Sequence, residues 1–410
     1  MKDVAGNGVV GGDGGKPDIV VVDNTLREGD QTPGVAFSVE QKLEILSLLV
    51  SAGVTVFDAA LPESSGSEVE FLKEASRRFP SIRLGASCRM IRSALEHAVA
   101  AGANELYAIV PVSDLHLFRR LKISREDLLR GIDEQLSGIA SSATLNIALE
   151  DSLNADPGFL RTAVERCADV GASRVFVADT LGSALPERVA AVTRAVRAAL
   201  PPGVAVGCHF HNDFGLALAN ALAAIGAGAT FPTAGVNGLG ERAGNTDLAQ
   251  LVAALRLLLH VDCPVRLDRV RDLSWRVCRM TGVLVSQNAP VTGFNAFRHT
   301  SGIHVDGMLK DRSTYGAIDP ADFGQKEQLV LGKHSGRAHI AHLLKEEVHD
   351  DPELMAELVA RVKRLAEQRA GSREAAALAD AFEAFNRQSL GLALEDLLRS
   401  IDEENGNGGL

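Results

Sequence analysis

The sequence predicts an α/β fold, a (β/α)8 TIM barrel, followed by a smaller and mostly helical C-terminal region. From Ile19 to about His260, short runs rich in Val, Ile or Ala alternate with stretches of helical periodicity. The short runs are nearly all apolar, which is typical of strands buried on both faces. Eight such units in about 240 residues match the barrel. An open doubly wound sheet is less favoured, because no glycine-rich phosphate loop follows the first run.

Each expected strand is a short apolar run that ends at polar or turn-forming residues. The runs, in order, are 19–24 (IVVVDN), 54–61 (VTVFDAAL), 82–88 (IRLGASC), 105–112 (ELYAIVPV), 144–151 (TLNIALED), 174–180 (RVFVADT), 205–213 (AVGCHFHND) and 230–238 (TFPTAGVNG).

The expected helices lie between the strands, and several begin at Ser or Pro and end at Gly, as capping preferences predict. Clear examples are 38–53, 93–102, 157–171, 186–200 and 215–228, and a final helix at 245–259 closes the series.

The region after the barrel has a different pattern. A helix is expected over 267–285, then a Gly-, His- and Asp-rich stretch over 292–320, then helices over 351–368 and 372–388. We therefore predict a disordered leader at 1–18, a catalytic barrel at 19–262, a linker and lid subdomain at 263–345, and a helical region at 346–410 whose last residues, 403–410, are disordered.

Composition excludes several classes of protein. The 410 residues are 46% hydrophobic, enough for a large core, and carry a net charge of −11, which argues against a nucleic-acid or anionic-membrane surface. Five scattered cysteines without a CxxC pattern suit a reducing cytoplasm. No run reaches the roughly 18 apolar residues of a membrane span. We expect a cytoplasmic protein.

The polar residues that follow the strands should meet at one mouth of the barrel, where active sites of this fold lie. The first strand ends in Asp23, Arg27, Glu28 and Gln31. Later strands contribute Arg89, Asn146, Glu150, Asp151, Asp179, Thr180, His209, His211, Asn212, Asp213, Asn237, Glu241, Arg242 and Asn245.

His209 and His211 are two residues apart on a strand, so both imidazoles project from the same face. Glu28 could complete a two-histidine, one-carboxylate metal site, and the amide oxygen of Asn245 is a fourth candidate ligand. Mixed N and O ligation suits Mg, Mn, Co, Zn or Fe(II). Chance or packing is the alternative explanation for the histidine pair, but the charged cluster on the first strand favours the metal.

Two more residues have possible roles at the mouth. Arg27, next to Glu28, could stabilise a developing oxyanion, with Asp23 fixing its guanidinium; the alternative is an ordinary loop arginine. Thr180 could cap the helix that begins at Pro186, or it could bind a substrate carboxylate. The residues leave both roles of Thr180 open.

Four motifs, DNTLREGDQ, CHFHND, GLGERAGN and HTSGIHVDG, resemble those of the acetyl-CoA-dependent 2-oxoacid condensing enzymes, a family with homocitrate, 2-isopropylmalate and citramalate synthases and related hydroxymethylglutaryl-CoA lyases. The resemblance covers about residues 19–340. It implies a divalent metal (Mg, Mn, Zn or Co) held by Glu28, His209, His211 and Asn245, acetyl-CoA as co-substrate, and a homodimer whose C-terminal region reaches the neighbouring active site.

The same resemblance suggests roles for individual residues. Arg27 would polarise the keto group of the 2-oxoacid, and His304 and Tyr315 match residues used in the second half-reaction. The candidate catalytic residues are Arg27, Glu150, His304 and Tyr315. The candidate substrate-binding residues are Gln31, Arg89, Asn146, Ala148 and Thr180.

The chain is most similar to homocitrate synthases in Glu28 of "REG", in its length, and in the segments CRM and PVSD. Two departures concern the substrate tail. Asn146 and Ala148 stand where lysine-pathway homocitrate synthases grip the distal carboxylate, and Asp58 stands where the family commonly has Glu. Arg89 could supply the cation for a carboxylate or a phosphonate tail. A phosphonomethylmalate or phosphinomethylmalate synthase and a citramalate or isopropylmalate synthase are therefore alternatives.

Two other classes of function are less favoured. A lyase of the hydroxymethylglutaryl-CoA type often carries a cysteine in the loop after the eighth strand, and NGLGERAGN has none. A non-catalytic binding protein would be expected to lack part of the metal set, which is complete in this sequence.

Overall fold

The structure, a computed structural model, describes residues 18–344, 351–369, 373–388 and 399–400. The predicted leader, apart from Asp18, and the end at 403–410 lie outside these residues. The described chain forms two compact units. The first contains residues up to Thr32, 36–293 and 322–324, and the second contains 33–35, 294–321 and the residues from Gln325 onward.

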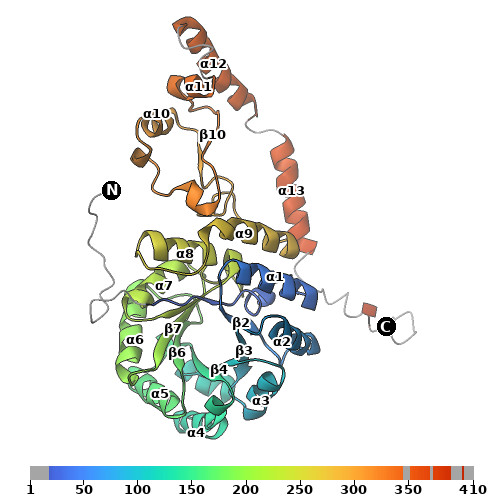
Figure 1. The fold of residues 1–410 in the computed structure, drawn as a ribbon, viewed down its shortest axis with the longest axis vertical. Helices are drawn as coiled ribbons and strands as arrows, with labels where there is room; N and C mark the ends of the chain where they lie inside the picture. Colours follow the sequence, from blue (N-terminus) through green and yellow to red (C-terminus); the bar gives the residue numbers. More distant parts are fainter. Residues whose placement is uncertain (1–17, 345–350, 370–372, 389–398, 401–410) are drawn as a thin grey trace. The chain divides into compact units, whose positions relative to one another are not determined.

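The first unit is a closed barrel in which each strand pairs in parallel with the next and β8 pairs with β1 (Figure 1). This confirms the predicted fold. The strands are β1 (Val22–Asp23), β2 (Val56–Ala60), β3 (Arg83–Arg89), β4 (Glu105–Pro111), β5 (Thr144–Glu150), β6 (Arg174–Asp179), β7 (Ala205–Phe210) and β8 (Phe231–Ala234).

Helices surround the strands in Figure 1, as the alternating sequence pattern predicts. They are α1 (Val39–Ser51), α2 (Gly66–Arg78), α3 (Arg92–Ala100), α4 (Arg125–Leu136), α5 (Pro157–Asp169), α6 (Pro186–Ala199), α7 (Ala217–Gly226), α8 (Leu248–Leu257) and α9 (Leu267–Thr281). Short 3-10 turns also occur at the strand ends, among them η1 (Gly29–Gln31), and a π-helical segment, η2, covers Leu115–Leu121.

Local sequence explains where several helices begin. Ser38 caps α1 and Ser124 caps α4, each as a capping box in which side chain and backbone bond reciprocally. Asp156 caps α5 and is followed by Pro157 in the first helical position. These caps fix the loops that leave the strand ends.

The barrel interior is packed with large side chains. Val22, Val56, Tyr107 and Phe176 form a buried cluster, and the rings of Tyr107 and Phe176 meet edge to face at 5.6 Å. Gly207 lies under the Phe176 ring, where an added Cβ would come within 2.3 Å of a ring carbon. The interior beneath the polar mouth is therefore filled by an apolar layer of side chains.

The first unit extends further than the sequence indicated. We predicted that the barrel ends at residue 262, but α9 packs on α1 and α8 and buries Val270, Leu273 and Val277. The amphipathic pattern of α9 shows that it is a helix but does not show which neighbour covers its apolar face.

The second unit contains two short paired strands, β9 (Arg298–His299) and β10 (Gln328–Leu329), and mostly helices. The helices are α10 (Gly302–Lys310), α11 (Arg337–Leu344), α12 (Pro352–Arg369) and α13 (Arg373–Gln388). The last two were predicted, whereas α10 lies in the region at 263–345 that we expected to be a linker and lid subdomain, in a stretch for which we predicted no helix.

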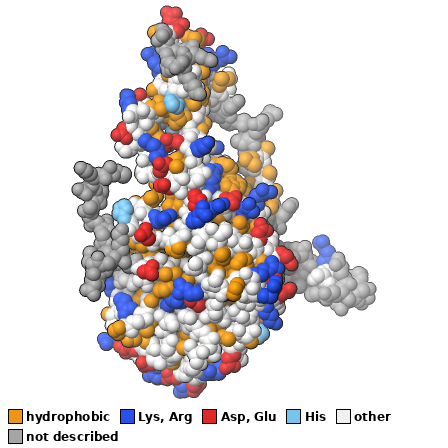
Figure 2. Space-filling model, viewed as in Figure 1, with side chains coloured by type: hydrophobic (Ala, Val, Ile, Leu, Met, Phe, Trp, Pro, Cys, Tyr) orange, Lys and Arg blue, Asp and Glu red, His pale blue; other side chains and the backbone are white. Residues whose placement is uncertain are grey.

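The visible face of the molecule mixes acidic and basic side chains (Figure 2). Within the described residues, no helix is both long enough and apolar enough to cross a lipid bilayer. All five cysteines are buried and free.

Candidate active site and metal centre

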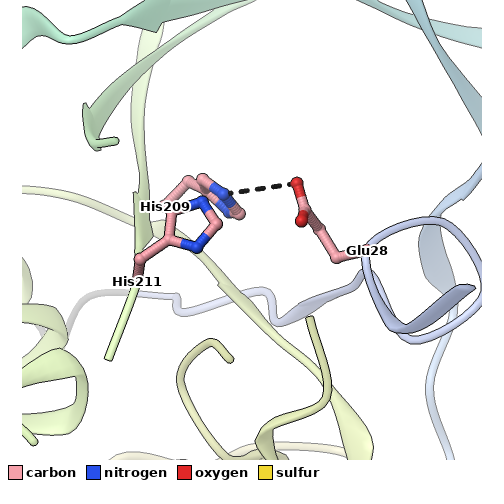
Figure 3. Close-up of side chains that lie close together, drawn as sticks. All are labelled: Glu28, His209 and His211. Carbon is pink, nitrogen blue, oxygen red and sulfur yellow. Dashed lines mark ion pairs between the residues drawn. The ribbon is translucent and has the colours of Figure 1, made fainter. Parts of the chain in front are cut away.

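Glu28, His209 and His211 lie together at the mouth of the barrel. Each offers one ligand atom, and these atoms all lie within 4.8 Å of one another. His209 Nε2 is 3.6 Å from Glu28 Oε1, and the two imidazole rings meet at 89°. Figure 3 shows the three side chains pointing toward a common space. The structure thus brings together three residues that are up to 183 positions apart in the sequence, the separation of Glu28 and His211.

Two buried atoms beside this cluster lack hydrogen-bond partners. They are His211 Nδ1 and Asn245 Oδ1, on side chains that are 7% and 2% exposed. The Asn245 amide nitrogen donates to Leu239 O at 3.2 Å, which leaves its oxygen free, and a backbone bridge joins His211 to Asn245. Because unpaired buried acceptors are costly, a bound cation would satisfy them. The residues therefore fit a divalent metal.

Both histidines are held in the form that can bind a metal. Burial, followed by the proximity of His211, lowers the pKa of His209 well below its ordinary value. Burial, then the positive charges of Arg242 and Arg27, lowers the pKa of His211 to about 4. Neutral imidazole is the ligating form, so both rings are available at neutral pH.

Arg27 is fixed by a carboxylate other than the one we predicted. Its Nε and Nη2 donate to Asp58 Oδ2 at 2.9 and 2.5 Å, and its Nη1 donates to Glu28. Ser87 Oγ donates to both Asp58 oxygens, at 2.9 and 3.1 Å. The expected role of Asp23 is wrong, because Asp23 accepts from the backbone and hydroxyl of Thr25 instead. Burial raises the pKa of Asp23 to about 7.

Sequence reasoning missed Asp58 as the partner of Arg27 and Ser87 as the partner of Asp58. They lie on neighbouring strands, β2 and β3, and both side chains face the barrel interior beneath the mouth. The signal was present in the alternation of inward and outward positions along each strand, which places Asp58 and Ser87 on the same side of the sheet.

Arg89, the predicted tail-binding cation, is engaged with Glu63. Its Nε and Nη2 both donate to Glu63 Oε1, at 2.9 and 2.7 Å, and its backbone N–H donates to Glu63 Oε2. Its side chain is 70% exposed. An anionic ligand would have to compete with Glu63 for this guanidinium.

The three predicted residues of β5 lie at different depths. Asn146 is fully buried near the start of the strand, where its amide bonds to Glu105 and Arg174. This arrangement contradicts a role in substrate binding, because both polar atoms of Asn146 are occupied away from the mouth. Ala148 and Glu150 are half-buried further along, and Glu150 accepts a hydrogen bond from Arg120.

Thr180 and Gln31 lie in loops at the mouth. Thr180 does not cap α6, so that alternative is wrong: its hydroxyl accepts from the Asp151 backbone N–H at 2.9 Å. Arg242 ties this loop to the next by donating to Thr180 O and to both oxygens of Asp213. Gln31 ends η1 and is half-buried.

His304 and Tyr315 meet within the second unit. Their rings stack at 4.3 Å with an interplanar angle of 30°. Gly307 leaves room for the tyrosine, since an added Cβ would lie 2.7 Å from its ring. The two residues that the resemblance paired by function are therefore neighbours.

Two family models match the chain. The first, described as HMGL-like, matches residues 18–277, and the second, "Homocitrate synthase post-HMGL domain-like", matches 291–370. The boundary between them agrees with the two units of the structure.

Curated relatives cover most of the chain. The 2-phosphonomethylmalate synthase of Streptomyces rubellomurinus is 39% identical over 80% of this chain and 88% of its own length. The "Probable 2-isopropylmalate synthase" of Ignicoccus hospitalis is 38% identical over 85% and 88%. The homocitrate synthase AksA of Methanopyrus kandleri is 35% identical over 86% and 89%.

Among solved structures, the hydroxymethylglutaryl-CoA lyase of Pseudomonas aeruginosa has a TM-score of 0.59 and 21% identity, and the match covers 67% of this chain and 96% of the lyase. At this identity the likeness concerns the fold, and it agrees with the barrel described above.

Proposed function

We propose a function from one premise: this chain belongs to the HMGL-like family. It is an acyltransferase that joins acetyl-CoA to an anionic 2-oxoacid in a Claisen-type condensation and releases CoA. The observation that carries the proposal is the cluster of Glu28, His209 and His211, with the unpartnered oxygen of Asn245 beside it. Relatives named as condensing synthases support the same reaction class.

Glu28, His209, His211 and Asn245 would hold the divalent cation. When bound, the cation supplies Lewis acidity toward the keto oxygen of the substrate. His209 lies on β7 and His211 directly follows it, whereas Glu28 and Asn245 lie in the loops that follow β1 and β8, so the four residues come from three separate strand–loop units of the barrel.

Arg27 would stabilise the negative charge that develops on the keto oxygen. Three of its five N–H groups are bonded to Asp58 and Glu28, which leaves one on each terminal nitrogen for the substrate. Asp58 and Ser87 keep the guanidinium in place before the reaction begins, which is the arrangement that oxyanion stabilisation requires. Thr180 and Gln31, at the same mouth, would contact the substrate carboxylate.

Glu150 would serve as the base that removes a methyl proton from acetyl-CoA. It is half-buried, and Arg120 and His116 are its neighbours. The stacked pair of His304 and Tyr315 would act in hydrolysis of the thioester, which makes the condensation irreversible. We also propose a homodimer in the cytoplasm; the resemblance supports the dimer, and the five free cysteines support the location.

The substrate class is a 2-oxoacid with an anionic tail, as in a homocitrate synthase. A phosphonate tail is the second candidate, and the relative from Streptomyces rubellomurinus favours it. Arg89 would meet the tail in either case, in competition with Glu63.

A thiol-release assay tests the proposal. Purified protein is given acetyl-CoA, excess Mg²⁺ or Mn²⁺, and in turn 2-oxoglutarate, oxaloacetate, phosphonopyruvate, pyruvate and 2-oxoisovalerate. We expect CoA release only when an accepted 2-oxoacid, acetyl-CoA and metal are all present, and none after chelation. Absence of thiol release with all five acids would refute the proposal.

A further inference from the structure

We propose that Thr233 is a positioning residue that holds His209 in its metal-binding tautomer. The inference rests on the proposed metal site, but it concerns a residue outside the ligand set. Thr233 lies on β8, is 7% exposed, and places its Oγ1 2.9 Å from His209 Nδ1. This is an ordinary hydrogen-bond length.

The two ring nitrogens of His209 face different partners. Nδ1 faces the Thr233 hydroxyl, whereas Nε2 faces Glu28 Oε1 at 3.6 Å, on the side of the metal cluster. A neutral imidazole carries one proton, and the nitrogen without the proton is the one that can bind a cation. His209 can therefore bind through Nε2 only when Nδ1 carries the proton and has an acceptor for it.

Thr233 is the acceptor in the right place. The other neighbour of Nδ1 is the Asn24 amide nitrogen at 3.5 Å, which can only donate and which lies at the outer limit for a hydrogen bond. The Thr233 hydroxyl can accept, and it is close. Donation from Nδ1 to Thr233 would thus leave the Nε2 lone pair directed at the metal cluster. Metal-bound histidines commonly donate their other ring N–H to a nearby acceptor in this way.

The barrel fixes the position of this hydroxyl. Thr233 pairs in register with Val22 of β1, and β8 also pairs with β7, which carries His209. Its side chain is 7% exposed and contacts the His209 ring from the neighbouring strand. Loss of the hydroxyl would leave a buried N–H of His209 without a partner in the ligating tautomer.

Direct metal binding tests this role without relying on turnover. The full-length protein is titrated with Mn²⁺, and free Mn²⁺ is measured by EPR. Thr233→Val preserves the size of the side chain but removes the acceptor, so we expect the Kd to rise about 10- to 100-fold. Thr233→Ser restores the hydroxyl and should bind within about threefold of the parent. Thr233→Ala removes the same hydroxyl with a smaller side chain that introduces no methyl group in its place, and the Val prediction applies to it if the Val variant does not fold.

Thr193→Val is the matched control. Thr193 is a buried threonine of α6 whose hydroxyl has no hydrogen-bond partner, so this variant makes the same chemical change on a helix that carries none of the proposed ligands. Its Mn²⁺ affinity should equal that of the parent.

The outcomes separate this inference from the proposed function. If the parent binds Mn²⁺ and the Thr233→Val and Thr233→Ala variants bind it equally well, the role of Thr233 is refuted while the metal site stands. If Thr233→Ser is as impaired as Thr233→Val, retaining the hydroxyl does not preserve metal binding, which also refutes the role. If the parent binds none, the metal site fails and the inference fails with it.

Discussion

The two ends of the barrel interior both bury charged side chains, but they treat them differently. At the start of the strands, Glu105 accepts from Arg174 at 2.8 Å, from Asn146 at 3.2 Å and from Tyr107 at 3.2 Å. We call Glu105, Arg174 and Asn146 the floor cluster. Its members bond to one another through Glu105 Oε2, whereas the buried Glu105 Oε1 accepts no hydrogen bond and lies 3.6 Å from Arg83 Nε.

At the mouth, by contrast, Glu28, His209, His211 and Asn245 lie together while His211 Nδ1 and Asn245 Oδ1 have no protein partner. Polar side chains that bond to one another are typical of a structural network, whereas several unpaired acceptors close to one another are typical of a ligand site. Burial of charge alone does not distinguish the two ends. The difference is that two side chains at the mouth leave atoms unpaired beside a third ligand candidate, whereas the one unpaired Glu105 oxygen of the floor cluster faces the cation of Arg83. This difference predicts opposite consequences of mutation.

His211→Ala should have the largest effect on turnover. Removal of one ligand should abolish metal binding and lower kcat by at least about 1000-fold, because a Lewis-acid metal contributes several kcal/mol and each 1.36 kcal/mol is tenfold. Thiol release and Mn²⁺ titration measure the two effects. His97→Ala, on the exposed face of α3, is the control. Full activity in His211→Ala would remove the ligand assignment.

Arg27→Lys should reduce kcat by at least about 100-fold, as removal of an oxyanion donor does. Lysine keeps the charge but cannot bond to Asp58 and Glu28 while also donating to the substrate in a fork. Steady-state thiol release at saturating substrate measures kcat. Arg77→Lys, on the exposed surface of α2, should leave kcat unchanged. A near-normal kcat in Arg27→Lys would show that charge alone suffices at this position.

Arg89→Ala should raise the KM about fivefold for 2-oxoacids with an anionic tail and leave the KM for pyruvate unchanged, because an exposed charge pair is worth up to about 1 kcal/mol. Glu63→Gln is the matched variant. It frees the Arg89 guanidinium and should lower the same KM. Equal effects of Arg89→Ala on the KM for pyruvate and for the dianionic acids would show that Arg89 does not bind the anionic tail.

Glu105→Gln should show the smallest effect on kcat and a clear effect on stability. The change leaves Arg174 buried without its carboxylate, and breaking a buried pair costs about 3 kcal/mol. The thermal unfolding midpoint should fall, while kcat per folded molecule stays within about threefold of the parent. A large loss of kcat with unchanged stability would mean that the floor cluster takes part in catalysis, and the contrast between the two ends would fail.

The sequence predicted the barrel, all eight strands and the grouping of Glu28, His209 and His211 at its mouth. The reason is that parallel strands place all their C-terminal ends at one mouth, whatever the details of packing. The same reasoning does not predict the partner of Arg27. Asp58 and Asp23 both follow apolar runs, yet only Asp58 bonds to Arg27. Which carboxylate meets a guanidinium depends on the depth and direction of each side chain inside the closed barrel.

By itself, then, the sequence determined the order of the elements and the residue types at the mouth, because periodicity and strand ends are local properties of the chain. The tertiary structure alone decided that Asn146 belongs to the floor cluster, that Glu63 holds Arg89, and that Thr233 faces His209. Those contacts join residues of different strands or of the loop between β2 and α2, and their positions are set only when the barrel closes.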